Sequence, residues 1–445
     1  MSALFHRNLK AVLPTVVGGE GSYLIDSNGK RYLDACGGAA VSCLGHGRPD
    51  VFAAISRQLD TIAYAHTGAF TNAPAEDLAE RLVSRAPAGF GRGRAMFLGS
   101  GSEAVEAALK LARQYHLERG EPQRAHFIGR NMAYHGNTLG ALSIGGHAAR
   151  RKPYAPLLME VGRVPACYAY RLKGDDETLE AFGLRVADEL ETEIQRLGPQ
   201  TVAAFVCEPV GGATLGCVPP APGYFARIRK ICDRHGVLLI ADEVMCGIGR
   251  TGSFYALDQE GISPDMITVA KGLGAGIMPV AATLASQKIV DAIAAGSGTL
   301  WNGHTYMSHA AACAGALAVL DAIDREKLIV RVREQGQKLE ALLRARFDQQ
   351  AYIGDIRGRG LFWTVEIVAD RPTKAPFPAA RNLAARIKAE AQAQGLLIYP
   401  SAGCADGVNG DHVLLAPAYI VTDQELTIIV DTLARVIDTC LAKDR

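Results

Sequence analysis

Long apolar segments and a charge imbalance are both missing from this chain of 445 residues. No apolar run reaches the roughly 20 residues that a membrane-spanning helix needs, and the first residues lack the apolar core of a signal peptide. The 47 basic and 46 acidic residues leave a net charge of +1. Such a balance gives no electrostatic support for binding nucleic acid or a membrane surface. We therefore expect neither kind of partner.

Paired cysteine motifs are also absent. The ten cysteines are scattered, no C-x-x-C pair occurs, and several cysteines lie inside apolar runs such as FVCEPV. This pattern argues against a disulfide scaffold and favours reduced thiols, so we expect a cytoplasmic protein. No internal repeat or low-complexity tract is visible, and no metal site is predicted. The hydrophobic content of 49% is ample for a sizeable core.

What the chain does contain is a distinctive central stretch from Gly236 to Gly276. Two short apolar runs in it, VLLIAD and MITVAK, are typical of buried parallel strands, and each ends in one charged residue. These residues are Asp242 and Lys271, which stand 29 positions apart. Ligands bind beyond the carboxyl ends of parallel strands. We therefore expect the carboxylate and the amine at one edge of a sheet, with glycines leaving room around the lysine.

This pair of residues suggests chemistry with pyridoxal 5'-phosphate (PLP). Taken singly, Asp242 is more often a helix cap, and Lys271 is more often a solvated strand end. Together they supply what PLP enzymes need. These are a lysine that forms a Schiff base with the cofactor, and an acid that keeps the pyridine nitrogen protonated. The protonated ring then acts as an electron sink.

At these residues the sequence resembles a known family. DEVMCGIGRTG, followed by PDMITVAKGLGAGIMPVAA, is similar to the motif of the class III, or ω-aminotransferase-like, group of fold-type I PLP enzymes. The resemblance extends from about residue 15 to the C-terminus. It implies an α/β fold with a large, mainly parallel sheet domain and a smaller α+β domain.

The order of features along the chain suits two domains, as its length also suggests. Within residues 1–60, the pair Asn28-Gly29 separates two alternating runs and predicts a β-hairpin with a tight primed turn. Residues 61–324 are expected to form the large PLP-binding domain. From about Arg325 the composition shifts to charged helix. Residues 325–445 are expected to complete the small domain together with the N-terminal segment.

A possible phosphate site lies in AMFLGSGSEAVEAALKLARQYH, which reads as strand, turn and helix. The turn Ser100-Gly101-Ser102 stands at the N-terminus of the amphipathic helix, where free backbone amides and the helix dipole favour an anion. An ordinary capped turn is the alternative for so short a segment. The family resemblance implies that this turn holds the cofactor phosphate.

The resemblance assigns four further residues to the cofactor. It implies that Tyr134 stacks on the ring, that His135 lies beside it, and that Glu208 supports it from the end of another strand. A buried structural carboxylate is the alternative for Glu208. In the family, the threonine at the place of Thr305 reaches the phosphate bound by a neighbouring subunit. We therefore expect a homodimer or a dimer of dimers.

The expected reaction is transfer of an amino group from an ω-amino acid or amine to a 2-oxo acid such as pyruvate. Lys271 would bind the cofactor covalently and move the proton, while Asp242 maintains the electron sink. Decarboxylases, racemases and aminomutases share this fold and motif, so they stay open as alternatives. An inactive PLP-binding protein is a further alternative. A dinucleotide-binding protein that uses the glycines of residues 272–276 is weaker, because the required glycine spacing and acidic residue are missing.

Substrate choice is indicated by two absences. Several ω-aminotransferases bind a carboxylate through an arginine in a C-terminal loop, but here Ser401 to Val421 contains no arginine or lysine. The ornithine and γ-aminobutyrate branches place a glutamate after the Glu-Pro motif to pair with that arginine, and no acid follows Glu208-Pro209 here. We therefore expect an amine donor whose reacting carbon lies away from any α-carboxylate. Arg151 is a candidate cation for the acceptor, with an ordinary surface role as the alternative.

Overall fold

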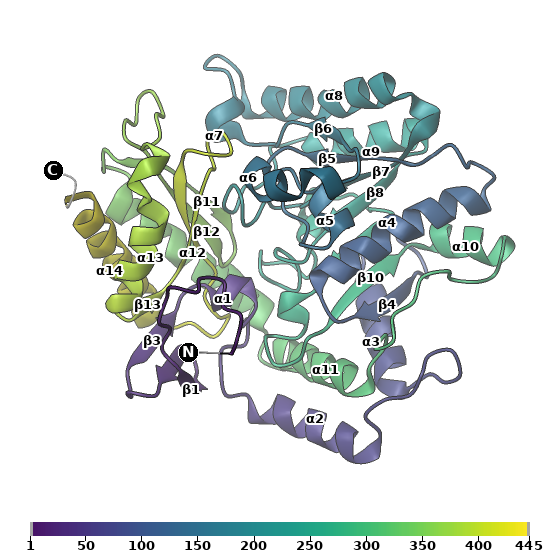
Figure 1. The fold of residues 1–445 in the computed structure, drawn as a ribbon, viewed down its shortest axis with the longest axis horizontal. Helices are drawn as coiled ribbons and strands as arrows, with labels where there is room; N and C mark the ends of the chain where they lie inside the picture. Colours follow the sequence, from purple (N-terminus) through teal and green to yellow (C-terminus); the bar gives the residue numbers. More distant parts are fainter. Residues whose placement is uncertain (1–2, 443–445) are drawn as a thin grey trace.

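Seven strands form the largest sheet of the structure, a computed structural model that describes residues 3–442. The strands are β4 (Arg94–Leu98), β5 (His126–Arg130), β6 (Gly162–Val164), β7 (Val202–Cys207), β8 (Leu238–Asp242), β9 (Met266–Val269) and β10 (Ala281–Ala285). Their order across the sheet is β4-β10-β9-β8-β7-β5-β6 (Figure 1). Strand β10 runs antiparallel to β4 and β9, and the other six strands run in one direction. The expected mainly parallel sheet is therefore confirmed.

Helices cover both faces of this sheet. One face packs on α8 (Leu179–Leu197) and α9 (Tyr224–His235). The other face packs on α4 (Gly101–Glu118), α5 (Leu139–Ile144) and α10 (Gln287–Ala295). On β8, Leu239 and Ala241 point to the first group of helices, while Leu238 and Ile240 point to the second. Because both faces are buried, the strand is apolar at every position except its last.

The remaining two sheets lie on the other side of the molecule (Figure 1). One contains β1 (Val16–Glu20), β2 (Tyr23–Asp26), β3 (Arg31–Asp34) and β13 (Leu396–Leu397); the other contains β11 (Ile353–Arg359), β12 (Phe362–Ile367), β14 (Tyr399–Ala402) and β15 (Asp411–Leu415). Helices α12 (Leu328–Phe347), α13 (Leu383–Ala393) and α14 (Asp423–Ala442) pack around them.

Segments from both ends of the chain meet in this part of the fold. The short strand β13 pairs in parallel with β3, so the N-terminal hairpin and the C-terminal region share one sheet. Helix α13 packs on β13, the strand next to β3 in this sheet (Figure 1). Helix α2 (Pro49–Thr61) instead packs on α11 (Ala310–Arg325). The domain boundaries expected from the sequence stay predictions.

The N-terminal hairpin forms where expected, but its predicted turn type is wrong. Both primed two-residue turns need positive φ at the first central residue, whereas here Gly29 has φ of +78° and Asn28 does not have a positive φ. The Asp26 carboxylate accepts hydrogen bonds from the amides of Asn28 and Lys30, at 2.9 and 3.0 Å. An aspartate that binds the following amides favours a longer loop closed by one left-handed glycine.

Two further expectations can be compared with the described residues. Within residues 3–442, no helix combines the length and the apolar character needed to cross a lipid bilayer. Each of the ten cysteines lies buried as a thiol, as expected from their positions in apolar runs.

Candidate active site

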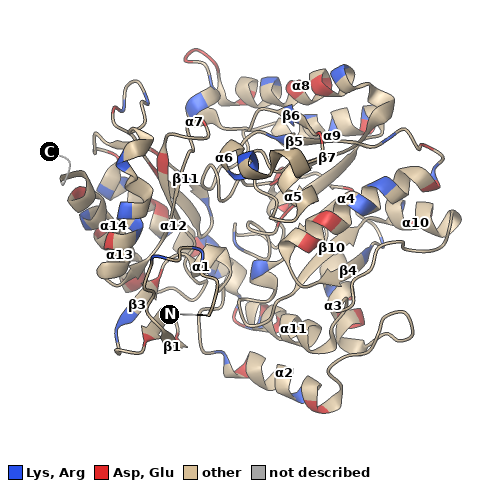
Figure 2. Ribbon diagram, viewed as in Figure 1, with Lys and Arg blue, Asp and Glu red and all other residues tan. Residues whose placement is uncertain are grey.

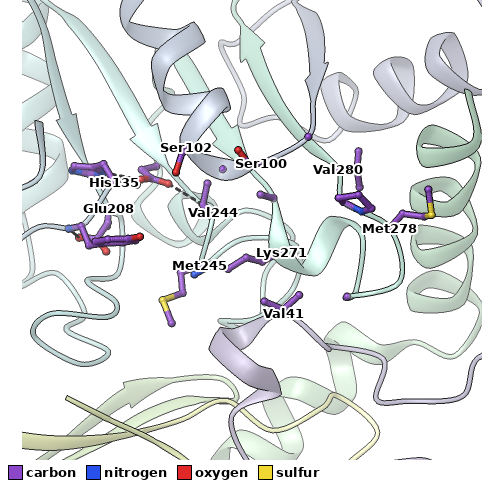
Figure 3. Close-up of a pocket in the computed structure, with 18 of the residues that line it drawn as sticks. Val41, Ser100, Ser102, His135, Glu208, Val244, Met245, Lys271, Met278 and Val280 are labelled. Atoms are coloured by element: carbon purple, nitrogen blue, oxygen red, sulfur yellow. Dashed lines mark hydrogen bonds and ion pairs between the residues drawn. The ribbon is translucent and has the colours of Figure 1, made fainter. Parts of the chain in front are cut away.

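The carboxyl ends of five strands, β4, β5, β7, β8 and β9, surround one cavity of about 430 Å³ (Figure 3). Each strand is followed by polar or charged residues that line this cavity. Of the nine residues assigned from the sequence, eight lie in its wall: Ser100, Gly101, Ser102, Tyr134, His135, Glu208, Asp242 and Lys271. The ninth, Thr305, does not line it. A parallel sheet thus gathers side chains that are far apart in the sequence.

Lys271 lies beyond β9 and not on it, which corrects its predicted place at the strand end. The strand stops at Val269, and Lys271 begins a short 3₁₀ turn with φ of +46°. Left-handed backbone is uncommon for a residue with a side chain, and such strain clusters at functional sites. The amine makes no hydrogen bond or ion pair with residues 3–442. Burial lowers the pKa of Lys271, while the charges of Asp242 and Glu208 oppose this shift.

Asp242 is buried and held from three directions. Its Oδ1 accepts hydrogen bonds from the amide of Val244 at 3.0 Å and from the hydroxyl of Thr268 at 3.2 Å. Its Oδ2 lies 2.7 Å from Nδ1 of His135. These contacts fix the direction in which the carboxylate faces the cavity. The second ring nitrogen of His135, Nε2, is buried without a partner among the described residues.

Sequence reasoning missed Thr268. This threonine lies opposite Asp242 in the ladder between β8 and β9. The sequence shows that Thr268 stands two residues before Ala270 and three before Lys271. It does not show how the two parallel strands are aligned, and so which residue lies opposite Asp242. The register depends on the crossover that joins the strands, so no local signal could have identified this contact.

Glu208 combines the two roles that were considered for it. It lines the cavity and is 5% exposed, and its Oε1 accepts a hydrogen bond from the amide of Gly212 at 3.0 Å. Burial raises the pKa of Glu208, and the nearby charges of His135 and Arg130 counteract the shift. The side chain therefore both supports the loop after β7 and presents a carboxyl group to the cavity.

The N-terminus of α4 provides the predicted anion-binding geometry. Ser100 is the N-cap, and its hydroxyl accepts a hydrogen bond from the amide of Glu103 at 3.3 Å. Gly101 passes so close to Val244 that a Cβ would lie 2.8 Å from its Cγ1. Within residues 3–442, the amides of Gly101 and Ser102 donate no hydrogen bond. The Ser100 cap uses the amide of Glu103, so the amides of Gly101 and Ser102 stay free to bind an anion.

Thr305 is exposed and lies outside the cavity. It does not cap the following helix, since the N-cap of α11 is His309. Its carbonyl accepts a hydrogen bond from the hydroxyl of Tyr64 at 2.8 Å. The preceding segment is held on α4, where Lys110 donates to Asn302 at 2.6 Å. The threonine is therefore held at the surface of this subunit.

Arg151 does not line the cavity either. It ends the short helix α6 (Ala148–Arg151), and the neighbouring Arg150 is the residue that lies near the cavity wall. The guanidinium carbon of Arg150 is 4.9 Å from the centre of the Tyr134 ring. This contact was not foreseen, because a helix of four residues does not reveal from its sequence which side chain contacts Tyr134. Arg150 is exposed, whereas Nε of Arg151 is buried without a partner among the described residues.

The family described as aminotransferase class-III matches residues 5–437. The chain belongs to the class III aminotransferases. This aminotransferase is 45% identical over 443 residues to an uncharacterized aminotransferase from Schizosaccharomyces pombe, a match that covers 99% of this chain and 95% of the relative. It is therefore an enzyme with the transferase activity of that family, and the dinucleotide-binding alternative is set aside.

Solved structures agree with this assignment. A PLP-bound amine transaminase from an uncultivated Pseudomonas species is similar with a TM-score of 0.91 and 35% identity, covering 99% of each chain. An (S)-enantioselective omega-transaminase from Thermomicrobium roseum is similar with a TM-score of 0.89 and 33% identity, covering 96% of this chain and 93% of the other. The aminotransferase has the fold of fold-type I PLP enzymes, and PLP is its cofactor.

The chemistry of the cavity fits this cofactor. PLP carries a phosphate, a ring nitrogen that binds an acid, and an aldehyde that reacts with an amine. The cavity offers free amides at the N-terminus of α4, the oriented carboxylate of Asp242, and the unpaired amine of Lys271. Figure 3 shows Ser100 and Ser102 in one part of the cavity and Lys271 in another, near Val41 and Met245.

Proposed function

We propose that the enzyme transfers an amino group from an amine or ω-amino acid to a 2-oxo acid such as pyruvate. The observation that carries this proposal is the composition of the cavity wall. Among the described residues, Lys271 is the only lysine or arginine in that wall. Much of the remainder is apolar: Val41, Val210, Val244, Met245, Ala270, Ile277, Met278, Pro279 and Val280. An uncharged donor chain suits such a wall, because the carboxylate of an ω-amino acid or of the acceptor needs a counter-charge from outside the wall.

The roles of the site residues follow from their chemistry. When bound, PLP supplies an electron sink for the carbon that carries the amino group. Lys271 would hold the cofactor covalently and then carry the proton at its amine, whose lowered pKa makes the neutral form more accessible. Asp242 would keep the ring nitrogen protonated, and His135 would hold Asp242 in place. Tyr134 would lie against the ring, and Glu208 would support the loop beside it.

Phosphate binding completes this assignment. We propose that Ser100, Gly101 and Ser102 bind the phosphate through backbone amides and hydroxyl groups. The close approach of Gly136 to Ser102 supports this, because a Cβ on Gly136 would lie 2.6 Å from the Ser102 hydroxyl. The helix end and the turn that carries Tyr134 are therefore held in contact.

A donor panel tests the function. Simple amines and ω-amino acids are compared with ornithine, γ-aminobutyrate and glutamate, with pyruvate and 2-oxoglutarate as acceptors. We expect turnover with amines and pyruvate. Conversion of the cofactor to its pyridoxamine form, followed by its absorbance, separates amino transfer from racemisation. A strong preference for glutamate with 2-oxoglutarate would contradict the proposal.

We also propose that the active unit is at least a homodimer in which Thr305 completes the partner's phosphate site. This is supported by the exposure of the segment that carries Thr305, in which Trp301 is 58% and Tyr306 is 70% exposed. Large apolar side chains at a surface are typical of interfaces.

Mixing two inactive variants tests the shared site. If Thr305 acts on the partner, a heterodimer of Thr305→Ala and Lys271→Ala subunits holds one site with both defects and one with neither. Activity should then reappear on mixing. A fully active monomer in sedimentation, or no complementation by proven heterodimers, would contradict this proposal. A cytoplasmic location also stays a prediction.

A further inference from the structure

The carboxylate of a 2-oxo acid needs a cation that the cavity wall does not supply. Among the described wall residues, Lys271 is the only lysine or arginine, and under the proposed function its amine is committed to the cofactor. The C-terminal loop from Ser401 to Val421 contains neither lysine nor arginine. The cation must therefore come from a side chain outside this wall, in this subunit or in its partner.

Arg150 is placed to provide it. Its guanidinium lies over the ring of Tyr134, a wall residue, at 4.9 Å from the ring centre. The side chain forms no ion pair or side-chain hydrogen bond with residues 3–442. A guanidinium stacked on an aromatic ring keeps its N–H groups free along the edge, where they can bind both oxygens of a carboxylate. Figure 2 shows basic residues on α6, in the centre of the view.

The position of Arg150 relative to Tyr134 is fixed by the backbone between them. The amide of Gly146 donates to the carbonyl of Ala133 at 2.9 Å. A Cβ on Gly146 would lie 2.1 Å from the carbonyl oxygen of Arg130, so only glycine permits this approach. The segment that enters α6 is therefore pinned to the turn that carries Tyr134.

The C-terminal loop also packs against α6. A Cβ on Gly407 would lie 3.7 Å from the Cβ of Ala148, which is ordinary packing contact. A Cβ on Gly403 would lie 3.3 Å from Nε2 of His147. The loop thus packs on the helix that carries Arg150, and it brings no cation of its own.

Arg151 has a different environment and offers a matched control. Burial and, to a smaller extent, the positive charge of Arg151 lower the pKa of Arg163 to about 10, so Arg151 lies near that residue. Arg163 binds the carbonyls at the C-terminus of α5, including that of Gly145 at 2.9 Å. Two adjacent arginines therefore face different neighbours.

We propose that Arg150 binds the carboxylate of the 2-oxo acid acceptor through two N–H groups on the edge of its stacked guanidinium. This inference rests on the proposed function, since it names the residue that would recognise the acceptor. It also predicts that the distal carboxylate of an ω-amino acid donor uses the same side chain.

The test compares Arg150→Gln, Arg150→Lys and Arg151→Gln in the holoenzyme. Loss of a charged hydrogen-bonding pair should raise the KM for pyruvate by about 10- to 100-fold in Arg150→Gln. Arg150→Lys should recover part of this loss, and Arg151→Gln should resemble the wild type. With propanal, an acceptor that lacks a carboxylate, all four proteins should behave alike. An equal KM for pyruvate in Arg150→Gln and wild type would overturn the inference, as would an equal loss with propanal.

A binding measurement separates this inference from the proposed function. Calorimetric titration with propanoate, a carboxylate that cannot accept an amino group, needs no turnover. Weaker propanoate binding by about 10-fold or more in Arg150→Gln, with normal binding in Arg151→Gln, supports the Arg150 site even if pyruvate is not the acceptor. Unchanged propanoate binding in Arg150→Gln would overturn the Arg150 site while leaving the transaminase proposal intact.

Discussion

Two buried polar regions of this aminotransferase differ in how their charges are matched. In the cavity, the amine of Lys271 makes no hydrogen bond or ion pair with residues 3–442, and Nε2 of His135 is buried without a partner among them. The second region, which we call the Glu366 cluster, lies between the two parts of the fold and is closed. Its members are Tyr168, Arg171, Arg357 and Glu366; the nearby ring of His412 is buried, and neither of its nitrogens has a hydrogen-bond partner among the described residues.

Charges in the Glu366 cluster are paired. Glu366 is fully buried, and its oxygens lie 2.6 Å from Arg171 and 2.7 Å from Arg357. The hydroxyl of Tyr168 donates to the same carboxylate. Arg357 also donates to the carbonyl of Gly216 at 2.7 Å, in the loop that follows Glu208. The two arginines hold the pKa of Glu366 below its ordinary value despite burial.

The Glu366 cluster uses buried polar groups to hold the fold together, whereas the cavity keeps them available for chemistry. A matched cluster joins strands and loops but has no group left to react. An unmatched amine costs stability and is retained where chemistry requires it.

Removal of the unmatched amine should eliminate activity without damaging the fold. We expect Lys271→Ala to lower turnover by at least about 1,000-fold, because both the covalent contact and proton transfer are lost. Without cofactor, its melting temperature should equal or exceed that of the cofactor-free wild type, since a poorly solvated amine is removed. Borohydride reduction and peptide mapping of the wild type should find the cofactor on Lys271. Cofactor attached to another lysine would refute the assignment.

Breaking the Glu366 cluster should lower stability and leave activity largely unchanged, which is the reverse of the effect expected for Lys271→Ala. Glu366→Gln should lower the free energy of unfolding by about 3–5 kcal/mol, because Arg171 and Arg357 lose their buried counter-charge. The kcat of the folded fraction should change little. Glu340→Gln is the control, since Glu340 forms an exposed pair with Arg344 at 2.9 Å that is worth about 1 kcal/mol or less. Urea unfolding measures the free energy of unfolding of both variants. An equal decrease in Glu366→Gln and Glu340→Gln would contradict a structural role of the Glu366 cluster.

Asp242→Asn should reduce kcat by about 10- to 100-fold or more while the cofactor stays bound. A neutral amide cannot keep the ring nitrogen protonated, and a hydrogen bond to a charged group contributes about 1.5–3 kcal/mol. Cofactor content is followed by absorbance, and turnover by the donor assay. Near-normal turnover would show that Asp242 does not maintain the electron sink.

The pH dependence of stability should report on His412. Burial and the charge of Arg357 lower the pKa of His412 from 6.5 to about 3 in the folded protein. The unfolded chain therefore binds the proton more readily, and stability falls as the pH decreases from 6.5 toward 3. This residue should account for about 2 kcal/mol between pH 7 and pH 5. His412→Leu should flatten the curve by that amount, whereas an unchanged slope would contradict the neutral buried ring.

Much of the site could be predicted because its signals are local. The apolar runs before Asp242 and Lys271 identify buried strands, and parallel strands place their ends at one edge. The turn at Ser100 likewise carries its cap, its glycine and its helix within a few residues. Thr268 and the Glu366 cluster could not be predicted, because they join segments that are far apart in the sequence. Arg171 and Glu366, for example, are separated by 195 residues.

By itself, the sequence determined which residues could form strands, where the reactive amine stands, and that the C-terminal loop carries no cation. Those properties depend on residue type and on spacing along one segment. The tertiary structure decided that Lys271 lies on a left-handed turn beyond its strand, and that Arg150, not Arg151, faces Tyr134. The reason is that side-chain direction in a short turn or helix is set by packing against distant backbone. At α6, the close approach of Gly146 to the backbone of Arg130 and its hydrogen bond to Ala133 hold the preceding segment against the turn that carries Tyr134.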